Sequence, residues 1–264
     1  MNKINRIVAY GCSYTAGDEL MDHVKMGMSF DECNQIKQRY ANNTVTQGYD
    51  IAAFRKDFEL PREYPLHRNS SWAAILARQL NISFENRAIN GSGLDEHYFK
   101  IYNDYTIGQI KDTDLVLIGL TTADRTIDFR PNRLMPHNIS FISGMIPNKD
   151  SSKLLLELWN DDFLVFHYFR TIHLLHFLSL KINLLMQPMR KTWTPSYIHT
   201  LDIPHTKHYV DSIWNECTSS ILSELYLEDT TPLCGFGHPS VESHMLLAEQ
   251  LEELVRNKFQ LLHS

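Results

Sequence analysis

Residues 4–17 read INRIVAYGCSYTAG, an apolar run with β-branched residues that leads into a turn bounded by Gly11 and Gly17. The run from Ile4 to Tyr10 predicts a buried strand, and the glycine after it predicts a turn. Ser13 would then lie where the chain passes from a sheet into a helix. We therefore expect the fold to begin with a strand that delivers Ser13 to the edge of a sheet.

Strand and helix patterns alternate along the rest of the chain. The run Leu115-Val116-Leu117-Ile118 is continuously apolar, as expected of a parallel strand covered on both faces. Further strands are predicted over 82–85 and 182–186, and helices over 71–80, 94–110, 152–180, 205–227 and from about 240. This alternation predicts an α/β fold, a three-layer doubly wound parallel sheet of the flavodoxin-like type.

Sites in such sheets lie at the carboxyl ends of the strands, which here means the loops at 11–17, 86–95 and 119–125. At 264 residues, with 43% hydrophobic and 21% charged residues, the chain is expected to form one globular domain over 1–264. Residues 18–68 are polar with scattered aromatics and two prolines, which is typical of an insertion lying over the domain.

Charge and hydropathy exclude several classes of partner. The net charge is −6 and no Lys/Arg cluster is present, so nucleic acid is not expected as a partner. No run approaches the ~20 apolar residues of a membrane span, and no secretory signal precedes Ile7, so we expect a cytoplasmic protein. No set of His, Cys and carboxylate residues has metal-ligand spacing, and no metal or other cofactor is predicted.

A second candidate for chemistry lies near the other end of the chain, in the run Gly235-Phe236-Gly237-His238-Pro239-Ser240. Pro239 and Ser240 are favourable residues for the start of the last helix, which would hold His238 in a fixed position directly before that helix. A serine hydroxyl needs a base to become nucleophilic, and histidine, with an ordinary pKa of ~6.5, suits that role. The alternatives are that Ser13 only caps a helix and that His238 is a structural residue.

These motifs, in this order, resemble the SGNH (GDSL-type) hydrolases. A glycine-flanked serine follows the first strand, an N-x-A-x-x-G loop follows the second, a loop that starts with Gly119 follows the third, and His-Pro-Ser precedes the last helix. The resemblance implies an insertion at 126–180, in addition to that at 18–68. It also implies Ser13 as the nucleophile and the main-chain N–H groups of Ser13 and Gly91 as oxyanion donors.

The chain departs from the family pattern in two places. Thr121 stands where the family has an oxyanion-donating asparagine, and it could instead cap a helix together with Asp124. Gly235 stands where the family has the aspartate that orients the histidine. A main-chain carbonyl from 234–236 could orient His238 instead, which would make a Ser-His dyad, and Asp229 is a remoter candidate.

Substrate contacts are predicted for Tyr14, Asn90 and Arg125, and the favoured alternative for Arg125 is a structural ion pair with a neighbouring acid. Cys12 is a competing nucleophile, but the family position falls on Ser13. The resemblance implies a serine esterase that cleaves a small-molecule ester, either a short acyl ester or a carbohydrate O-acetyl group, through an acyl-serine intermediate. The alternatives are an inactive binding module on the same fold and an assembly protein built on the aromatic helix at 152–180.

Overall fold

The structure is a computed structural model of the chain, in which the fold is built around a parallel sheet. It describes residues 3–17, 20–42, 51–61, 65–90, 92–120, 125–128, 137–140, 161–189, 207–218, 221–223, 225 and 239–261. For some of these, including 125–128 and 137–140, only the backbone is described.

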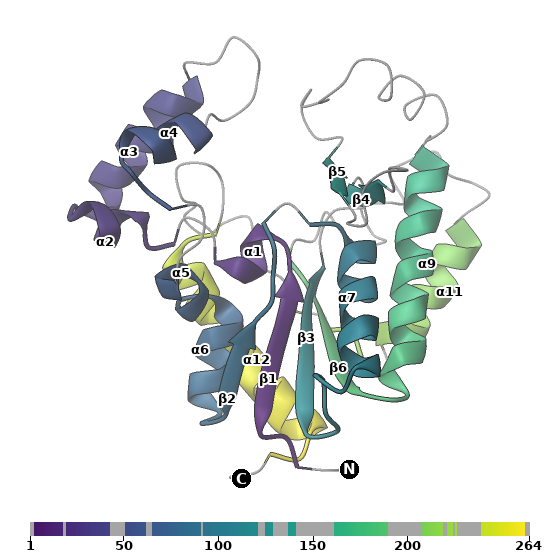
Figure 1. Ribbon diagram of the computed structural model, residues 1–264. Helices are drawn as coiled ribbons and strands as arrows, with labels where there is room; N and C mark the ends of the chain where they lie inside the picture. Colours follow the sequence, from purple (N-terminus) through teal and green to yellow (C-terminus); the bar gives the residue numbers. More distant parts are fainter. Residues whose placement is uncertain are drawn as a thin grey trace.

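Four parallel strands form the central sheet, and their order confirms the predicted α/β fold (Figure 1). Gly11 lies beside Gly119, and Gly119 lies beside Gln187, so the carboxyl ends of three strands meet at one edge. The order in the sheet is β2 (Ser83–Asn86), β1 (Arg6–Gly11), β3 (Asp114–Leu120) and β6 (Asn183–Pro188). All four strands fall where the sequence predicts them.

A short fifth segment extends the sheet beyond β6. The Met186 amide donates to the Ile221 carbonyl at 2.7 Å, and the Ser223 amide donates to the Met186 carbonyl at 2.9 Å, which makes a parallel bridge between Met186 and Leu222. The helix predicted over 205–227 is therefore wrong beyond Thr218, where α11 (Lys207–Thr218) ends. Short apolar runs such as Ile221-Leu222 fit a helix or a strand equally well by spacing, and pairing with the sheet decides the matter here.

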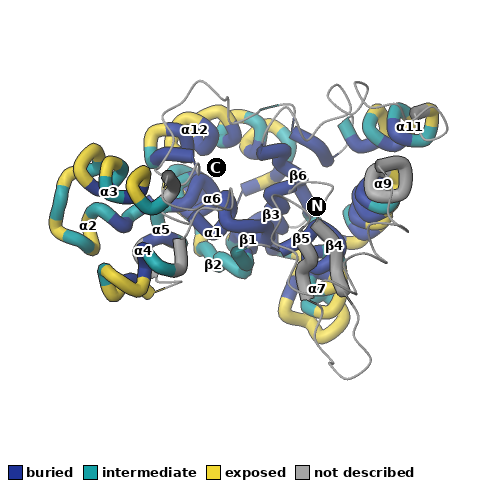
Figure 2. Tube along the Cα trace, turned by 90° about the horizontal axis from the view of Figure 1, so that it is seen from above, coloured by how far each residue is buried: buried dark blue, intermediate teal, exposed yellow. Residues whose placement is uncertain are grey.

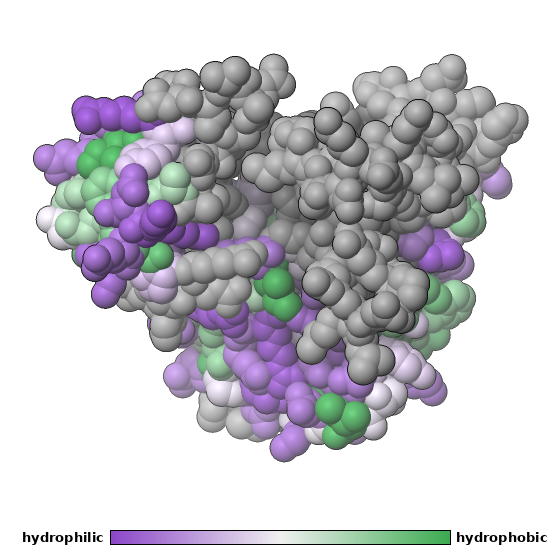
Figure 3. All heavy atoms as spheres, turned by 45° about the horizontal axis from the view of Figure 1, so that its top comes forward, coloured by the Kyte–Doolittle hydropathy of each residue, from purple (hydrophilic) through white to green (hydrophobic). Residues whose placement is uncertain are grey.

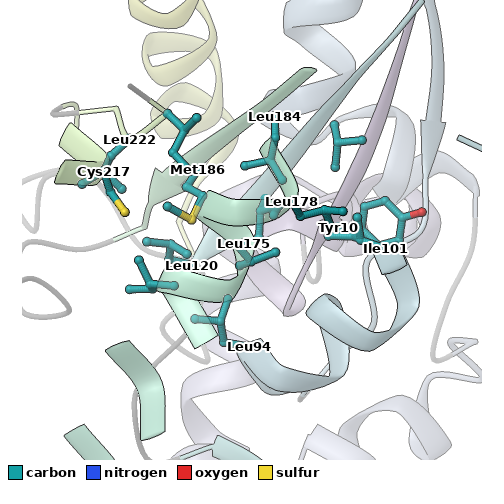
Figure 4. Packing of buried hydrophobic residues seen from close by; sticks show 14 of the residues in the cluster. Tyr10, Leu94, Ile101, Leu120, Leu175, Leu178, Leu184, Met186, Cys217 and Leu222 are labelled. Carbon is teal, nitrogen blue, oxygen red and sulfur yellow. The ribbon is translucent and has the colours of Figure 1, made fainter. Parts of the chain in front are cut away.

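Helices cover both faces of the sheet, as the three-layer prediction requires (Figure 2). Successive strand residues point to opposite faces, so Val8 and Tyr10 pack on one side and Ile7 and Ala9 on the other. Figure 4 shows part of the apolar cluster on the first side, with residues such as Tyr10, Leu175 and Met186. The covering helices are α7 (Leu94–Thr106), α9 (Asp161–Ser179) and α11 on that side, and α6 (Trp72–Gln79) and α12 (Val241–Lys258) on the other.

The α9 helix lies within the region where the sequence predicts one, and residues 152–160 lie outside the described part. Phe169, Ile172 and Leu175 of α9 are fully buried against the sheet. No helix among the described residues is long and apolar enough to cross a membrane. Upstream of α9, the backbone forms an antiparallel hairpin of β4 (Arg125–Asp128) and β5 (His137–Ser140), which the sequence does not predict.

The described residues of the segment predicted as an insertion at 18–68 form four helices, which Figure 1 shows beside the carboxyl edge of the sheet. We call the first three the α2–α4 lobe: α2 (Asp22–Met26), α3 (Phe30–Asn42) and α4 (Ile51–Asp57). Its own small cluster of buried apolar residues consists of Cys33, Phe54 and Leu60. The fourth helix, α5 (Pro65–Asn69), contacts α1 and α6 and so joins the lobe to the sheet layers.

The described surface on the face drawn in Figure 3 is mostly hydrophilic, and its hydrophobic side chains form small separate areas. A broad apolar patch would suggest a protein or membrane contact. The described part of this face carries no such patch.

Candidate active site

Ser13 lies in a tight turn at the end of β1, as the sequence predicts. The strand ends at Gly11, Cys12 is the N-cap residue, and the single-turn helix α1 (Ser13–Ala16) follows at once. The amides of Thr15 and Ala16 both donate to the Cys12 carbonyl, at 3.0 and 2.9 Å. Because the N-cap position belongs to Cys12, and no side chain caps α1, the structure does not support the alternative role of Ser13 as a helix cap.

The glycines around this turn are explained by Thr15. A Cβ atom at Gly11 or at Gly119 would overlap the Thr15 Oγ1 atom, so α1 can sit across β1 and β3 only because both positions lack a side chain. Gly11 also has φ +152°, which L side chains rarely adopt. Gly119, which the sequence marks only as the start of a loop motif, therefore serves to bring α1 close to the sheet.

Cys12, the competing nucleophile, is fully buried and belongs to the apolar cluster on the α6–α12 side. Tyr168 of α9 is a buried phenol whose pKa is raised by burial and, to a smaller extent, by the charge of an ionised Cys12. A reactive thiol needs an exposed, electropositive setting. The surroundings of Cys12 are instead apolar, which favours Ser13 over Cys12 as the reactive group.

Asn86 joins the turn that contains Ser13 to the loop after β2. Its Nδ2 donates to the Thr15 carbonyl at 3.0 Å, and its Oδ1 accepts from the Ala88 amide at 3.0 Å. From the other side, Arg68 of α5 donates to the carbonyls of Asn86 and Ala88, at 2.6 and 3.4 Å. One side-chain amide thus fixes the end of α1 and the start of this loop relative to each other.

The second connection between the two loops runs through the Gly11 carbonyl. This oxygen accepts from the Ile89 amide at 2.9 Å and from the Ser92 hydroxyl at 3.1 Å. The Ser92 amide also donates to the Ile89 carbonyl at 3.2 Å, which closes a turn from 89 to 92. The residues on both sides of position 91 are therefore held against the strand end that carries Ser13.

The predicted site residues fall into three groups. Gly91, Thr121 and His238 lie outside the described residues, as do Asp229, Cys234 and Gly235. The backbone of Arg125 begins β4, opposite Ser140, and its side chain is outside the described part. The third group consists of Ser13, Tyr14 and Asn90, whose side chains the structure describes.

Ser13 and Asn90 lie on the two loops that the Gly11 carbonyl joins, and Tyr14 lies elsewhere. Tyr14 is 8% exposed and belongs to the apolar cluster that packs α6 and α12 on the sheet, which does not favour its predicted contact with substrate. Asn90 is partly exposed, and its Oδ1 is a buried acceptor with no hydrogen-bond partner in the described part of the chain. A buried acceptor of this kind is unusual and marks this loop as a place for a polar contact.

Three residues that matter here were not singled out by the sequence, namely Thr15, Asn86 and Ser92. Asn86 is the first residue of the N-x-A-x-x-G motif, and the motif alone does not show what the Asn86 side chain binds. Thr15 and Ser92 carry no sequence signal of their own. Among the described residues, no three His, Cys, Asp or Glu side chains lie together as a metal site would require.

No protein-family model matches the sequence, and a search of curated proteins finds no match. Several solved structures are similar to the chain. One is a family two carbohydrate esterase from Clostridium thermocellum in complex with cellohexaose, which is 17% identical in sequence and has a TM-score of 0.46. The match covers 98% of this chain and 66% of the esterase chain. The chain thus spans about two thirds of the length of that esterase.

Two further similar structures are matched along nearly their whole length. A putative lipolytic protein of the G-D-S-L family from Desulfitobacterium hafniense is 12% identical with a TM-score of 0.46, covering 95% of this chain and 99% of its own. A psychrotrophic esterase from Pseudoalteromonas sp. is 13% identical with a TM-score of 0.45, covering 96% of this chain and 97% of its own. At such identities and TM-scores, these matches bear on neither the reaction nor the substrate of the chain.

Proposed function

We propose that the chain is a serine hydrolase that cleaves an ester through an acyl-enzyme formed on Ser13. The observation that carries the proposal is the nucleophile turn: Ser13 begins a helix at the carboxyl end of β1, and Asn86 and the Gly11 carbonyl tie this turn to the loop after β2. Rigid positioning of a serine beside a second loop is what acyl transfer requires, because the oxyanion must meet preorganised donors.

The proposed reaction has two steps. In the first, His238 takes the Ser13 proton while Oγ attacks the acyl carbon, and the same proton then goes to the leaving alkoxide. In the second, His238 takes a proton from water as the water oxygen attacks the acyl-serine, the bond between the acyl carbon and Ser13 Oγ breaks to release the acid, and His238 returns the proton to Ser13 Oγ. The N–H groups of Ser13 and Gly91 would hold the oxyanion, each such donor being typically worth ~3 kcal/mol, with Thr121 in the place of the third donor.

The substrate class we propose is a small ester, either a short acyl ester or a carbohydrate O-acetyl group, with Asn90 and Arg125 as substrate contacts. Esters are favoured over amides because an alkoxide leaving group needs less help from a protonated histidine. That matters here because Gly235 replaces the acid that would orient His238 and stabilise its charged form.

The proposal is tested with a fluorophosphonate probe and peptide mapping by mass spectrometry. We expect one label per chain, on Ser13, with no labelling of Ser13→Ala or His238→Ala and full labelling of the Cys12→Ala control. A non-catalytic binding module is the competing function, and the near-complete burial of Ser13, at 6% exposure, is the observation in its favour. Absence of labelling in a folded wild-type chain would support that module and overturn the hydrolase.

A further inference from the structure

A buried histidine, His97, contacts the loop that follows β2. It lies in the first turn of α7, and it is fully buried. Its Nε2 atom is 2.8 Å from the Ser92 hydroxyl oxygen, which is itself fully buried. Ser92 is also the residue whose hydroxyl reaches the Gly11 carbonyl, so two successive hydrogen bonds connect His97 with the strand end that carries the nucleophile turn.

The direction of the bond between His97 and Ser92 follows from counting protons. The Ser92 Oγ atom lies 2.7 Å from the Ile89 carbonyl and 3.1 Å from the Gly11 carbonyl. An oxygen–oxygen distance of 2.7 Å, as to the Ile89 carbonyl, requires a proton between the two atoms, and a hydroxyl has a single proton, which here also points toward the Gly11 carbonyl. The Ser92 proton is therefore directed at the two carbonyls, and His97 must donate its Nε2–H to Ser92 Oγ.

This arrangement makes His97 the group that fixes the rotation of the Ser92 hydroxyl. Without the Nε2–H donor, the Ser92 proton could turn away from the carbonyls, and the turn from 89 to 92 would lose its second bond to Gly11. The Ile89 amide would remain as the only main-chain link to Gly11 that the described residues provide between these two loops. The spacing between the loops would then be less well defined.

We propose that His97, acting through Ser92, is a positioning residue that sets the spacing between the nucleophile turn and the loop at 89–92. The inference rests on the proposed hydrolase function, since that spacing determines how an oxyanion on the acyl group meets donors from both loops. Positional errors of about 1 Å at a reacting centre typically cost on the order of 10²-fold in rate. His97 touches neither nucleophile nor substrate, so its effect is expected in kcat rather than in KM.

The test compares His97→Leu, Ser92→Ala and His97→Gln by p-nitrophenyl acetate kinetics and by the rate of fluorophosphonate labelling at Ser13. We expect the first two to lower kcat and the labelling rate by roughly 10–100-fold with KM nearly unchanged. Because a glutamine side chain at this position would carry an amide N–H near the place of Nε2, His97→Gln should recover most of the rate. The double variant Ser92→Ala/His97→Leu should be no slower than the slower single variant, because both changes remove one pathway.

The matched control is Thr171→Val on α9, which also removes a buried hydroxyl, one that donates to the His167 carbonyl at 3.0 Å. It should leave kcat unchanged. Normal kcat in His97→Leu with a lowered melting temperature would show a structural role only and overturn the positioning proposal, while the wild-type labelling would still support the hydrolase. Absence of wild-type labelling and turnover would overturn both proposals together.

Discussion

Two of the buried polar clusters in the described part of the chain are built from different chemistry. At the carboxyl edge of the sheet, Asn86 and Ser92 make neutral hydrogen bonds to main-chain carbonyls. In the α2–α4 lobe, Lys37 Nζ lies 2.7 Å from Asp22 Oδ2, and both side chains are 1% exposed. His67 Nε2 is 3.1 Å from Asp22 Oδ1, and its Nδ1 accepts from the Met21 amide at 3.2 Å.

The difference reflects what each region has to hold in place. Among its described residues the lobe buries few apolar side chains, Cys33, Phe54 and Leu60, so we infer that the charged cluster helps to specify its packing. At the sheet edge the apolar core already fixes the strands. The side chains that join the two loops there, Asn86 and Ser92, are neutral, and the charged Arg68 binds only the loop after β2 in the bonds described above. The regions meet at Gly17, where an added Cβ would lie 2.5 Å from the His67 carbonyl.

The largest effect is expected from Lys37→Met, which keeps the length of the side chain but leaves the Asp22 carboxylate buried without its ammonium partner. Breaking a buried ion pair in this way typically costs about 3–5 kcal/mol. The loss should appear in urea unfolding and as faster amide exchange in α2 and α3. The double variant Lys37→Met/Asp22→Asn should recover part of the loss, and equal loss in both would mean that the ion pair does not stabilise the lobe.

A smaller effect is expected at the sheet edge from Gly119→Ala, because the new Cβ would overlap Thr15 Oγ1. Overpacking of this kind typically costs roughly 1–3 kcal/mol. Thr15→Ala removes the overlapping atom, and Thr15 Oγ1 has no hydrogen-bond partner among the described residues. Gly119→Ala/Thr15→Ala should therefore be more stable than Gly119→Ala alone in thermal unfolding. A double variant that is less stable would show that Thr15 is not what requires a glycine at 119.

The smallest change in stability is expected on mild acidification. It leaves both clusters intact near neutral pH, and at lower pH it acts on the charged cluster alone. Burial alone would raise the pKa of Asp22, but the hydrogen bond from His67 and the charge of Lys37 outweigh it and lower the pKa from 3.8 to about 2. Since the folded pKa lies below the unfolded one, the stabilisation is complete above about pH 4 and is lost as the pH falls toward 2.

This pH dependence is measured by comparing wild type with Asp22→Asn in urea unfolding across that acid range. The stability of the wild type should fall more steeply with decreasing pH, because only the wild type takes up a proton at position 22 on unfolding. Parallel curves for the two chains would contradict the lowered pKa of Asp22.

The sequence predicts the sheet and the place of Ser13 because both depend on local patterns, such as the apolar runs of β1 and β3. It fails at Ile221 and Leu222, where a short apolar run continues a helical spacing and pairing with β6 decides the conformation. It also gives no sign that Lys37 is buried, because a lysine on a polar helix is normally solvated.

The hydrogen bonds that hold the candidate site in place cannot be predicted from the sequence for a related reason. The bond from Asn86 to Thr15 joins residues 71 positions apart, and the bond from Ser92 to Gly11 joins residues 81 positions apart. Such contacts form only when the sheet brings two strand ends together. A sequence motif can therefore identify a loop without showing which of its side chains fix the position of that loop.

The central claim, that Ser13 forms an acyl-enzyme, is tested most directly by rapid quenching of the p-nitrophenyl acetate reaction and intact-mass measurement. The account predicts a burst of nitrophenolate and a chain heavier by one acetyl group, located on Ser13 by peptide mapping and absent from Ser13→Ala. Acetylation at another residue, or equal release of nitrophenolate by wild type and Ser13→Ala, would contradict it.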